Sequence, residues 1–284
     1  MACNSKSDPN EQINKELLAI STFLDTYKTT HPNDVIVYDA YGESIVVQTL
    51  GSGLLPHTGQ KVKVTYTARL FPDNTVFDQG VINDKIDNIT IDGLKVGVSY
   101  LMQGSEATIY IPSQNGFGSA GSTNPAFLTP VPPNTTIVYQ VKLDTVMRTT
   151  DERTQFLKDS TAIQAYFETN NITNVVYHPA GLWYSTDNAG GGQPQPNVYD
   201  KVDVTVKGLL IADGKTFQQE APLQGYYILS LIDGFKIALP LLKKGDAAVL
   251  YLPSGLGYGT TEKKGVPANS SLLFNVKITD VYSN

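Results

Sequence analysis

The two halves of this chain repeat the same short motifs in the same order, about 140 residues apart. Matching segments at an offset of 140 are residues 64–68 with 204–208 and 75–78 with 215–218. At an offset of 141 they are residues 91–94 with 232–235, 111–113 with 252–254, and 117–118 with 258–259. The repeat is longer than the units of solenoid proteins, so it predicts two copies of one domain. A chain of 284 residues can bury two separate cores.

Composition excludes several classes of protein. The 24 glycines and 16 prolines break the chain into short segments, which favours an all-β or α+β fold. Because the net charge is -6 and no run of Lys or Arg exceeds two, nothing in the sequence could neutralise a phosphate backbone, and we expect no nucleic-acid partner. No stretch approaches the roughly 20 apolar residues of a membrane-spanning helix.

The one cysteine, Cys3, rules out an intrachain disulfide and argues against a thiolate metal site. Met1-Ala2-Cys3 followed by polar residues resembles the mature start of a bacterial lipoprotein, in which the cysteine is lipidated. The alternative is a free thiol beside an initiator methionine. The resemblance implies a polar tether over residues 1–10 and membrane attachment only through Cys3. The predicted location is the envelope of a Gram-negative bacterium, in the periplasm or at the outer membrane, with the cytoplasm as the alternative.

Each repeat is predicted to begin with its own amphipathic helix. Residues 11–29 and about 151–169 carry apolar side chains spaced for one helix face, and these are Ile13, Leu17, Ile20, Leu24, Tyr27, Phe156, Ile163, Tyr166 and Phe167. Asp8-Pro9 is a plausible start for the first helix. The helices place the domains at residues 11–148 and 149–284.

Strand patterns follow each helix. Residues 44–50 and 182–185 are strand-like, and Val62, Val64 and Tyr66 alternate with polar residues, as do Val202, Val204 and Val206 in the second copy. Each domain ends with another strand, at residues 137–146 and 272–281. Residues 187–197 are too polar and Gly-rich to pack, so a mobile loop is predicted there. The patterns predict an α+β domain, an antiparallel sheet with helices on one side.

Five motifs together resemble the FKBP-type peptidyl-prolyl cis/trans isomerase domain. In the first copy they are residues 64–67, Phe77-Asp78, residues 91–94 with Gly97, Phe117-Gly118, and residues 131–139. The resemblance covers residues 59–147 and 199–284. It implies two tandem FKBP-like domains, each a curved antiparallel sheet packed on a short helix, and each preceded by an extra helix as in bacterial relatives.

The implied activity is rotation about the peptide bond before proline, with no cofactor. This rotation faces a barrier of about 20 kcal/mol and takes about 10 to 100 s uncatalysed. Because the twisted amide loses its charge-separated resonance, an apolar pocket that excludes water favours it. Such a pocket needs no nucleophile or metal, which suits a sequence without a His/Cys cluster, a nucleophile elbow or a phosphate loop.

The resemblance assigns the first pocket residue by residue. Asp78 would be the buried carboxylate that orients Tyr66 and polarises the site, and Ile91 would offer its backbone N–H to a substrate carbonyl. Leu94 would form the floor, where the family commonly has Trp, and Phe117 stands where the family usually has a Tyr hydroxyl that holds the peptide. The remaining walls would be Tyr66, Phe77, Val131 and Tyr139. The family also has an aromatic wall between the positions of Asp78 and Ile91, and no residue of this shorter stretch is assigned to it.

The second copy retains the apolar part of this pocket, in Phe217, Ile232, Phe235, Tyr258, Val266 and Phe274. Val206 replaces the Tyr and Gln218 replaces the Asp, so both members of a polar pair are lost together. The first domain is therefore predicted to isomerise X-Pro segments of exported proteins, as an enzyme or folding helper. The second domain is predicted to be weak or inactive and mainly to bind or support.

Two other functions fit the same residues. A non-catalytic module of the cell envelope would bind proline-containing or apolar peptides in both pockets, and a structural repeat of a surface assembly would have vestigial pockets. At residue level, Tyr139 and Phe274 could be ordinary core, and Asp78 could be a solvated turn residue. His31, His57 and His178 lie beside Pro or turn residues and are predicted to be surface histidines.

Overall fold

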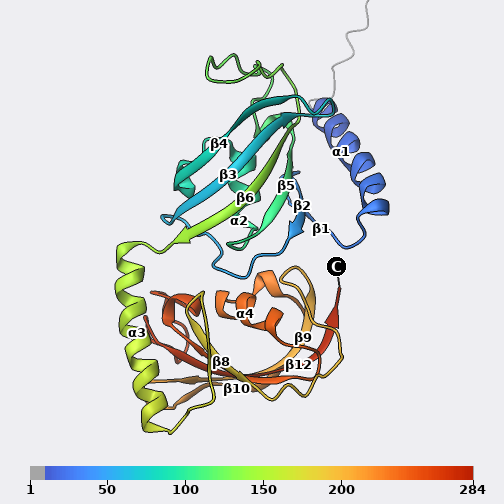
Figure 1. Ribbon diagram of the computed structural model, residues 1–284. Helices are drawn as coiled ribbons and strands as arrows, with labels where there is room; N and C mark the ends of the chain where they lie inside the picture. The colour runs from blue at the N-terminus through green and yellow to red at the C-terminus, as the bar shows by residue number, and fades with distance from the viewer. Residues whose placement is uncertain (1–9, 284) are drawn as a thin grey trace, which may run out of the picture. The chain divides into compact units, whose positions relative to one another are not determined.

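The computed structural model of this protein describes residues 10–283, which divide into two compact units between Met147 and Arg148 (Figure 1). The first unit contains α1 (Glu11–Thr30), β1 (Val35–Tyr38), β2 (Ser44–Thr49), β3 (Lys61–Leu70), β4 (Val76–Lys85), η1 (Ile86–Asn88), α2 (Asp92–Ser99), β5 (Glu106–Ile111), η2 (Ser113–Asn115) and β6 (Ile137–Met147). The second contains α3 (Thr150–Thr169), β7 (Val176–His178), β8 (Leu182–Thr186), β9 (Lys201–Leu210), β10 (Thr216–Tyr227), η3 (Ile228–Ser230), α4 (Asp233–Ala238), η4 (Leu239–Leu241), β11 (Ala247–Leu252), η5 (Ser254–Leu256) and β12 (Leu272–Tyr282).

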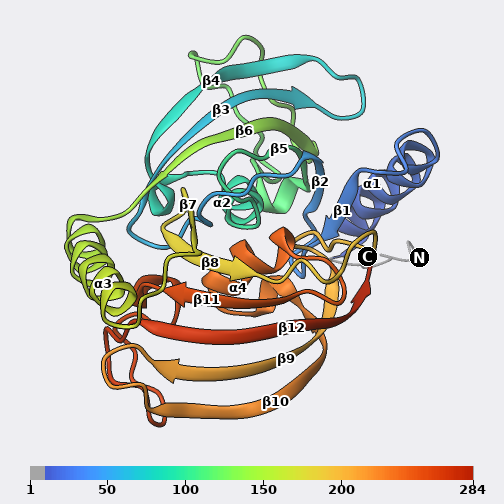
Figure 2. The same ribbon diagram turned by 60° about the horizontal axis from the view of Figure 1, so that its bottom comes forward.

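Each unit is built on one six-stranded antiparallel sheet. The strand orders are β1-β2-β5-β6-β3-β4 and β10-β9-β12-β11-β8-β7, which are the same topology written from opposite edges. Figure 2 shows β10, β9, β12 and β11 side by side, with α4 packed on their sheet. Two sheets of one topology, each with a leading helix and a short helix, confirm the predicted α+β fold of two tandem domains.

The short helices α2 and α4 pack closely on one face of their sheets. A Cβ atom on Gly97 would clash with the Ile109 side chain of β5, and one on Gly234 would clash with Leu252 of β11. The absence of a side chain therefore lets each helix backbone approach the strand beneath it. We call the face that carries α2 or α4 the inner face of the sheet.

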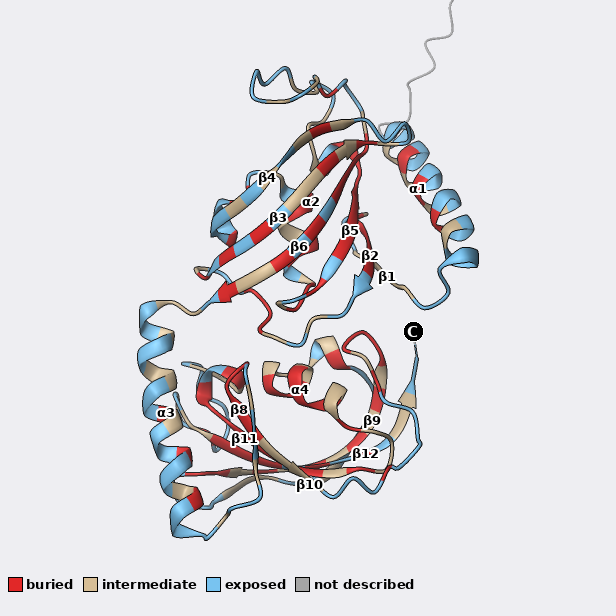
Figure 3. Ribbon diagram, in the orientation of Figure 1, coloured by how far each residue is buried: buried red, intermediate tan, exposed pale blue. Residues whose placement is uncertain are grey.

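The leading helices cover the opposite, outer face. Ile20 and Leu24 of α1 pack with Val46, Tyr110 and Val138, and Ile163 and Phe167 of α3 pack in the same way in the second unit. Side chains alternate along a strand, so Tyr110 points to the outer face while Ile109 and Ile111 point to α2. The prediction of helices on one side of the sheet is therefore wrong. Figure 3 shows the result, with a buried stripe on the sheet side of α1 and exposed residues on the other.

A buried carboxylate attaches each leading helix to the turn that follows β5 in the first domain and β11 in the second. Glu16 of α1 is 7% exposed and accepts hydrogen bonds from the Ser113 backbone N–H and Oγ, both at 2.6 Å, and from Thr136 Oγ1 at 2.8 Å. Asp159 of α3 does the same with the N–H and Oγ of Ser254, at 2.8 and 2.6 Å. The apolar stripes alone did not predict these two carboxylates.

The two leading helices begin differently. The N-cap of α1 is Asn10, which makes no side-chain capping bond, and Asp8-Pro9 lies outside the described residues. Thr149 caps α3 through a capping box, in which its Oγ1 accepts from the Glu152 N–H while Glu152 Oε2 accepts from the Thr149 N–H. Its hydroxyl thus satisfies a helix N–H that would otherwise lack an acceptor.

Most residues of the loop at 187–197 are exposed, but hydrogen bonds anchor it at three points. The Gly190 N–H donates to Asp246 Oδ1 at 2.6 Å, the Lys244 N–H donates to the Pro194 carbonyl at 2.8 Å, and Gln195 Nε2 donates to the Pro240 carbonyl at 2.6 Å. The anchoring groups are the Gly190 N–H, the Pro194 carbonyl and the Gln195 amide, which find partners on the segment before β11, and the mobility of the loop stays a prediction.

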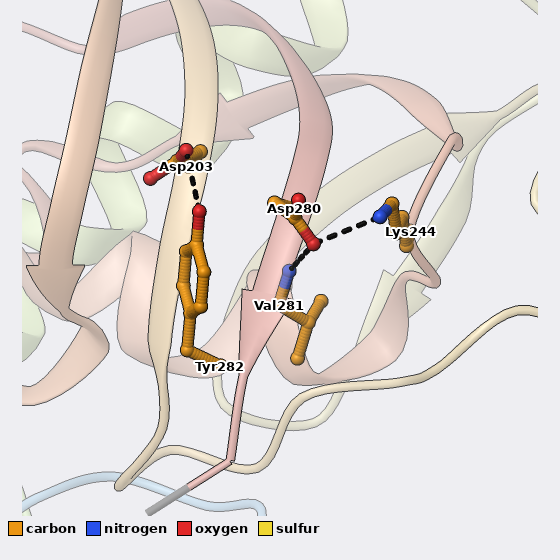
Figure 4. Close-up of polar contacts among 5 residues, drawn as sticks. All are labelled: Asp203, Lys244, Asp280, Val281 and Tyr282. Atoms are coloured by element: carbon orange, nitrogen blue, oxygen red, sulfur yellow. Dashed lines mark hydrogen bonds and ion pairs between the residues drawn. The ribbon is translucent and has the colours of Figure 1, made fainter.

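The end of the second sheet is held by a small set of polar contacts, shown in Figure 4. The Tyr282 hydroxyl donates to Asp203 of the neighbouring strand at 3.1 Å, and Lys244 Nζ pairs with Asp280 Oδ1 at 2.8 Å. A register shift between Ile278 and Asp280 marks a bulge in β12 at this point. These contacts join the last strand to β9 and to the turn before β11.

Within residues 10–283, no helix combines the length and hydrophobicity that crossing a bilayer requires.

Removing the buried carboxylate of α3 should destabilise the second domain. In Asp159→Ala the Ser254 N–H and hydroxyl lose their acceptor inside the protein, so we expect the free energy of unfolding to fall by about 2 to 4 kcal/mol. The only tryptophan, Trp183, lies in the core beside α3, so its fluorescence during urea unfolding reports this domain. Glu168→Ala on the exposed face of α3 is the control, with an expected change within about 0.5 kcal/mol. Equal effects of the two substitutions would contradict this account.

Candidate functional site

A β-bulge brings two neighbouring residues of β4 to the same site. Ala68 pairs with Asp78 and Arg69 pairs with Val76, so Phe77 is the extra residue of the bulge. In a regular strand Phe77 and Asp78 would face opposite sides, but a bulge re-aims a side chain. The second domain has the same shift, since Gly208 pairs with Gln218 and Leu209 with Thr216, which leaves Phe217 unpaired.

Tyr66 and Asp78 form the predicted hydrogen-bonded pair, but Asp78 is half-buried and not buried as predicted. The Tyr66 hydroxyl donates to Asp78 Oδ2 at 2.9 Å, and Asp78 Oδ1 accepts the Gln79 N–H at 2.9 Å. Burial, followed by the hydrogen bond and the charge of Asp78, raises the pKa of Tyr66 to about 12. The phenol is therefore neutral at physiological pH and the carboxylate is its acceptor.

An aromatic cluster surrounds Phe77 beside this pair. The Phe77 ring makes edge-to-face contacts with Phe117, Phe127 and Tyr139, with centroid separations of 6.0, 5.3 and 6.1 Å. Tyr139 also lies 5.5 Å from the Tyr66 ring, which links the cluster to the polar pair. Tyr66, Phe77, Asp78, Phe117 and Tyr139, predicted from separate motifs, therefore lie together on the inner side of the first sheet.

The sequence missed Phe127, which comes from the loop between β5 and β6. Its ring lies 5.6 Å from Phe117, and the neighbouring Leu128 N–H donates to the Phe77 carbonyl at 2.8 Å. Reciprocal 2.8 Å backbone hydrogen bonds between Ser122 and Val131 close the loop on which Phe127 lies. The only sequence signal for Phe127 is a lone aromatic in a stretch rich in Pro, Ser and Thr.

The other predicted residues of the first site lie around α2 and the loop. Leu94 and Val131 are each 2% exposed, and Phe77 and Tyr139 are 0% and 3% exposed. Ile91 is the N-cap residue of α2, and its backbone N–H has no acceptor among residues 10–283. A free N–H at a helix start can receive a carbonyl oxygen. The site thus combines a closed apolar base with a polar pair and one open donor.

The second site contains aromatic contacts but no polar pair. Phe274 contacts Phe217 at 5.6 Å and Phe235 at 4.9 Å, while Tyr258 lies 6.4 Å from Phe217. Val206 is 1% exposed, and Val266 is also buried. Ile232 is the N-cap residue of α4, as Ile91 is of α2. The loop before β12, residues 253–271, is shorter than residues 112–136 and supplies no aromatic in the place of Phe127.

Residues 10–283 contain no group of three or more His, Asp or Glu side chains that could hold a metal ion. His31 and His57 are exposed, but His178 is half-buried, contrary to the prediction for that residue. Burial lowers the pKa of His178, and its Nδ1 meets the Ala180 N–H at 3.2 Å. Cys3 lies outside the described residues.

The sequence profile of the family described as FKBP-type peptidyl-prolyl cis-trans isomerase matches residues 54–144 and 192–279, more than half of the chain. The chain therefore belongs to the FKBP-type peptidyl-prolyl cis-trans isomerase family, as its motifs predicted. Each match covers four of the six strands, the short helix and the aromatic site of one domain, and excludes the leading helix and the two strands that follow it.

Individual relatives are similar over shorter stretches. The chain is 37% identical over 105 residues to the isomerase FkpA of Buchnera aphidicola, covering 36% of this chain and 43% of that protein. It is 38% identical over 105 residues to FkpA of Escherichia coli, covering 36% of this chain and 38% of that protein. The chain thus spans about two fifths of the length of these relatives.

Solved structures with detectable similarity include two of this family. The crystal structure of FkpA from Escherichia coli has a TM-score of 0.38 and 29% identity, covering 46% of this chain and 64% of that chain. The crystal structure of the three FKBP domains of wheat FKBP73 has a TM-score of 0.36 and 22% identity, covering 86% of this chain and 97% of that chain.

A second buried carboxylate of the first domain, Glu43, bonds to the segment that carries Phe117. Glu43 is 1% exposed, its Oε1 accepts from Asn115 Nδ2 at 2.6 Å, and its Oε2 has no hydrogen-bond partner among the described residues. Burial, followed by the nearby Asp39 carboxylate, raises the pKa of Glu43 to about 7. Asp39 Oδ2 also accepts from the Tyr100 hydroxyl at 3.1 Å.

The raised pKa of Glu43 predicts that this group favours folding under mildly acidic conditions. Between the unfolded value of 4.5 and about 7 the folded state binds more protons than the unfolded state, so the stability of the first domain should fall as pH rises through this window. The expected loss is on the order of 1 to 3 kcal/mol. Urea unfolding followed by circular dichroism at pH 5 and pH 7.5 measures it, and Glu43→Gln should remove the pH dependence that this group contributes. An unchanged pH profile in that variant would refute the assignment.

Proposed function

We propose that the first domain catalyses cis/trans isomerisation of X-Pro peptide bonds. The observation that carries this proposal is the hydrogen-bonded pair of Tyr66 and Asp78, at 2.9 Å, beside the aromatic cluster around Phe77. Membership of the isomerase family supports the reaction, and the pair supplies polarity at one edge of an otherwise apolar site.

The catalytic contribution of such a site is electrostatic and steric. An apolar surround of Phe77, Leu94, Val131 and Tyr139 favours the twisted amide, which has less charge separation than the planar one. The free N–H of Ile91 would hold a substrate carbonyl, and Tyr66 and Asp78 would fix the polar edge. Phe127 would serve as the aromatic wall for which the sequence offered no residue. No proton is transferred and no covalent intermediate forms.

We propose that the second domain is weakly active or inactive and mainly binds or supports. Val206 and Gln218 stand in place of the hydrogen-bonded pair, so the site beside Phe217 has no counterpart of the Asp78 carboxylate. Its apolar residues Ile232, Phe235, Val266 and Phe274 still suit apolar segments of a client protein.

A non-catalytic peptide-binding module is the second candidate. Phe117 provides no hydroxyl for a substrate, and Leu94 stands where the family commonly has a larger ring. Phe77 is fully buried, which favours a site with limited access to proline. In this case peptides would bind without acceleration of isomerisation.

One pair of matched variants distinguishes an isomerase from a non-catalytic binding module. Asp78→Ala removes the acceptor of Tyr66, so we expect kcat/KM for a prolyl peptide to fall at least about tenfold while peptide affinity survives. Gln218→Ala alters the equivalent position of the second domain and should change kcat/KM less than twofold. A protease-coupled or NMR exchange assay on the full chain measures both. If only Gln218→Ala loses activity, the second domain is the active one. If the unaltered protein does not accelerate isomerisation, the peptide-binding module is the remaining candidate.

We further propose that the protein acts in the bacterial cell envelope on X-Pro segments of exported proteins, as an isomerase or folding chaperone. Similarity to FkpA of Gram-negative bacteria supports this placement. The Ala2-Cys3 motif and the polar residues after it support a lipid anchor at the periplasmic side of a membrane.

Substitution of Cys3 should release the protein from membranes. When the native precursor is expressed in a Gram-negative host, the unaltered protein should incorporate labelled fatty acid and sediment with the membrane fraction. Cys3→Ser should do neither and should appear in the soluble fraction. An unaltered protein that is unlabelled and soluble would contradict the anchor without bearing on the isomerase activity.

A further inference from the structure

A cleft lies on the outer face of the first sheet, beneath α1, whereas the proposed isomerase site lies on the inner face. Its inner part encloses about 400 Å³ and is lined by Phe23, Tyr27, Gln48, Arg69, Leu70, Phe71, Pro72, Asn74, Thr108, Tyr110, Val138 and Gln140. It continues into a groove of about 770 Å³ along α1, and the two cavities share Phe23, Tyr27, Phe71 and Pro72. The combined space is therefore elongated.

Three aromatic rings form the apolar wall of this cleft. Phe23, Phe71 and Tyr110 lie 5.6 to 5.9 Å apart in edge or tilted contacts. Phe23 is 43% exposed even though it belongs to this trio. Because the Phe23 ring is partly exposed, a further apolar group can pack against these three rings.

Arg69 is the single charged side chain of the inner cleft. Its Nε donates to Gln140 Oε1 at 3.1 Å and its Nη1 to the Asn74 carbonyl at 3.2 Å, both neutral acceptors. It forms no ion pair with any residue from 10 to 283, and no Asp or Glu lines the inner cleft. The adjoining groove has one carboxylate in its lining, Glu16, which already accepts hydrogen bonds from Ser113 and Thr136. A guanidinium with only neutral partners retains capacity for an anion.

Neutral polar groups accompany Arg69 on the sheet. Gln48 Nε2 donates to Thr108 Oγ1 at 2.9 Å, and the hydroxyl of Tyr110 has no hydrogen-bond partner within residues 10–283 although the residue is only 6% exposed. Burial raises the pKa of Tyr110 to about 12, so its hydroxyl can act as a donor at neutral pH.

The second domain shows what this region looks like without such a site. By strand register, Leu209 stands at the position of Arg69 and Val249 at that of Thr108. Both pack into an apolar cluster with Tyr251, which Ile172 and Val175 also join. The second copy thus has apolar side chains where the first has Arg69 and Thr108, although Ile172 and Val249 also line a cavity of about 700 Å³ there.

We propose that this cleft binds the C-terminal end of an apolar polypeptide, with the carboxylate at Arg69 and the last side chain among Phe23, Phe71 and Tyr110. Charge complementarity selects an anion, the aromatic trio selects an apolar residue beside it, and the adjoining groove along α1 has room for the residues that precede it. The site differs from the proposed isomerase site in position and chemistry, and it needs no proline.

A matched pair of peptides tests this proposal by calorimetry on the full chain. Acetyl-Ala-Ala-Phe with a free carboxylate should bind, and the same peptide as its C-terminal amide should bind at least about tenfold more weakly, because a charge-assisted hydrogen bond is lost. Equal affinities, or no binding of either peptide, would overturn the proposal. If free 3-phenylpropionate binds as tightly as the peptide, the residues before the last one make no contact, and the proposal of a bound polypeptide end is wrong.

Variants then locate the site. Arg69→Leu should abolish the preference for the carboxylate, and Leu209 shows that this strand position accommodates leucine. Lys63→Leu, which removes a positive charge elsewhere on the same strand, should preserve the preference. Arg69→Leu should leave isomerisation unchanged, and Asp78→Ala should leave peptide binding unchanged. If Arg69→Leu keeps the preference for the carboxylate, the peptide does not bind in this cleft and the proposal is wrong.

Discussion

One strand in each domain is apolar on both faces, and the helices are arranged around that constraint. In β5 the side chains of Ile109 and Ile111 face α2, while Tyr110 faces α1. A strand of this kind must be covered twice, because either face left open would expose apolar surface to water. The leading helix is therefore part of the domain core. The turn after β5 then carries Ser113, whose bonds to Glu16 hold α1 in place, and four residues later Phe117 enters the site.

Sequence patterns predicted the parts of this arrangement that depend on local order. The repeat, the amphipathic helices and the Phe77-Asp78 motif are contiguous signals, and the bulge that makes the motif useful occurs in both copies. Glu16 and Asp159 were missed because a carboxylate within a helix normally faces solvent. Both follow a glutamine four residues earlier, Gln12 and Gln155, whose amides bond to them. This repeated spacing is the signal that could have revealed them.

Other features depend on contacts between distant segments, and pattern alone could not predict them. Phe127 reaches Phe77 only because Ser122 and Val131 close its loop, and composition does not reveal that closure. The anchoring of the Gly-rich segment at residues 187–197 depends on acceptors near β11, notably Asp246. The two-sided packing of the sheet also requires knowing which face each helix covers. In each case the missing information is the partner of a backbone or side-chain group.

The two domains differ in the same way on both faces of the sheet. On the inner face Tyr66 and Asp78 correspond to Val206 and Gln218, and on the outer face Arg69 and Thr108 correspond to Leu209 and Val249. Single replacements would be costly, because a polar group that loses its partner in a buried setting keeps the full desolvation penalty. On the inner face both members of the bonded pair differ between the copies, so neither is left without its partner. On the outer face Arg69 and Thr108 bond to other residues, Gln140 and Gln48, and the second domain has apolar side chains in their place. Because the second domain has the same strand topology without these polar groups, ligands explain their presence in the first domain better than the fold does.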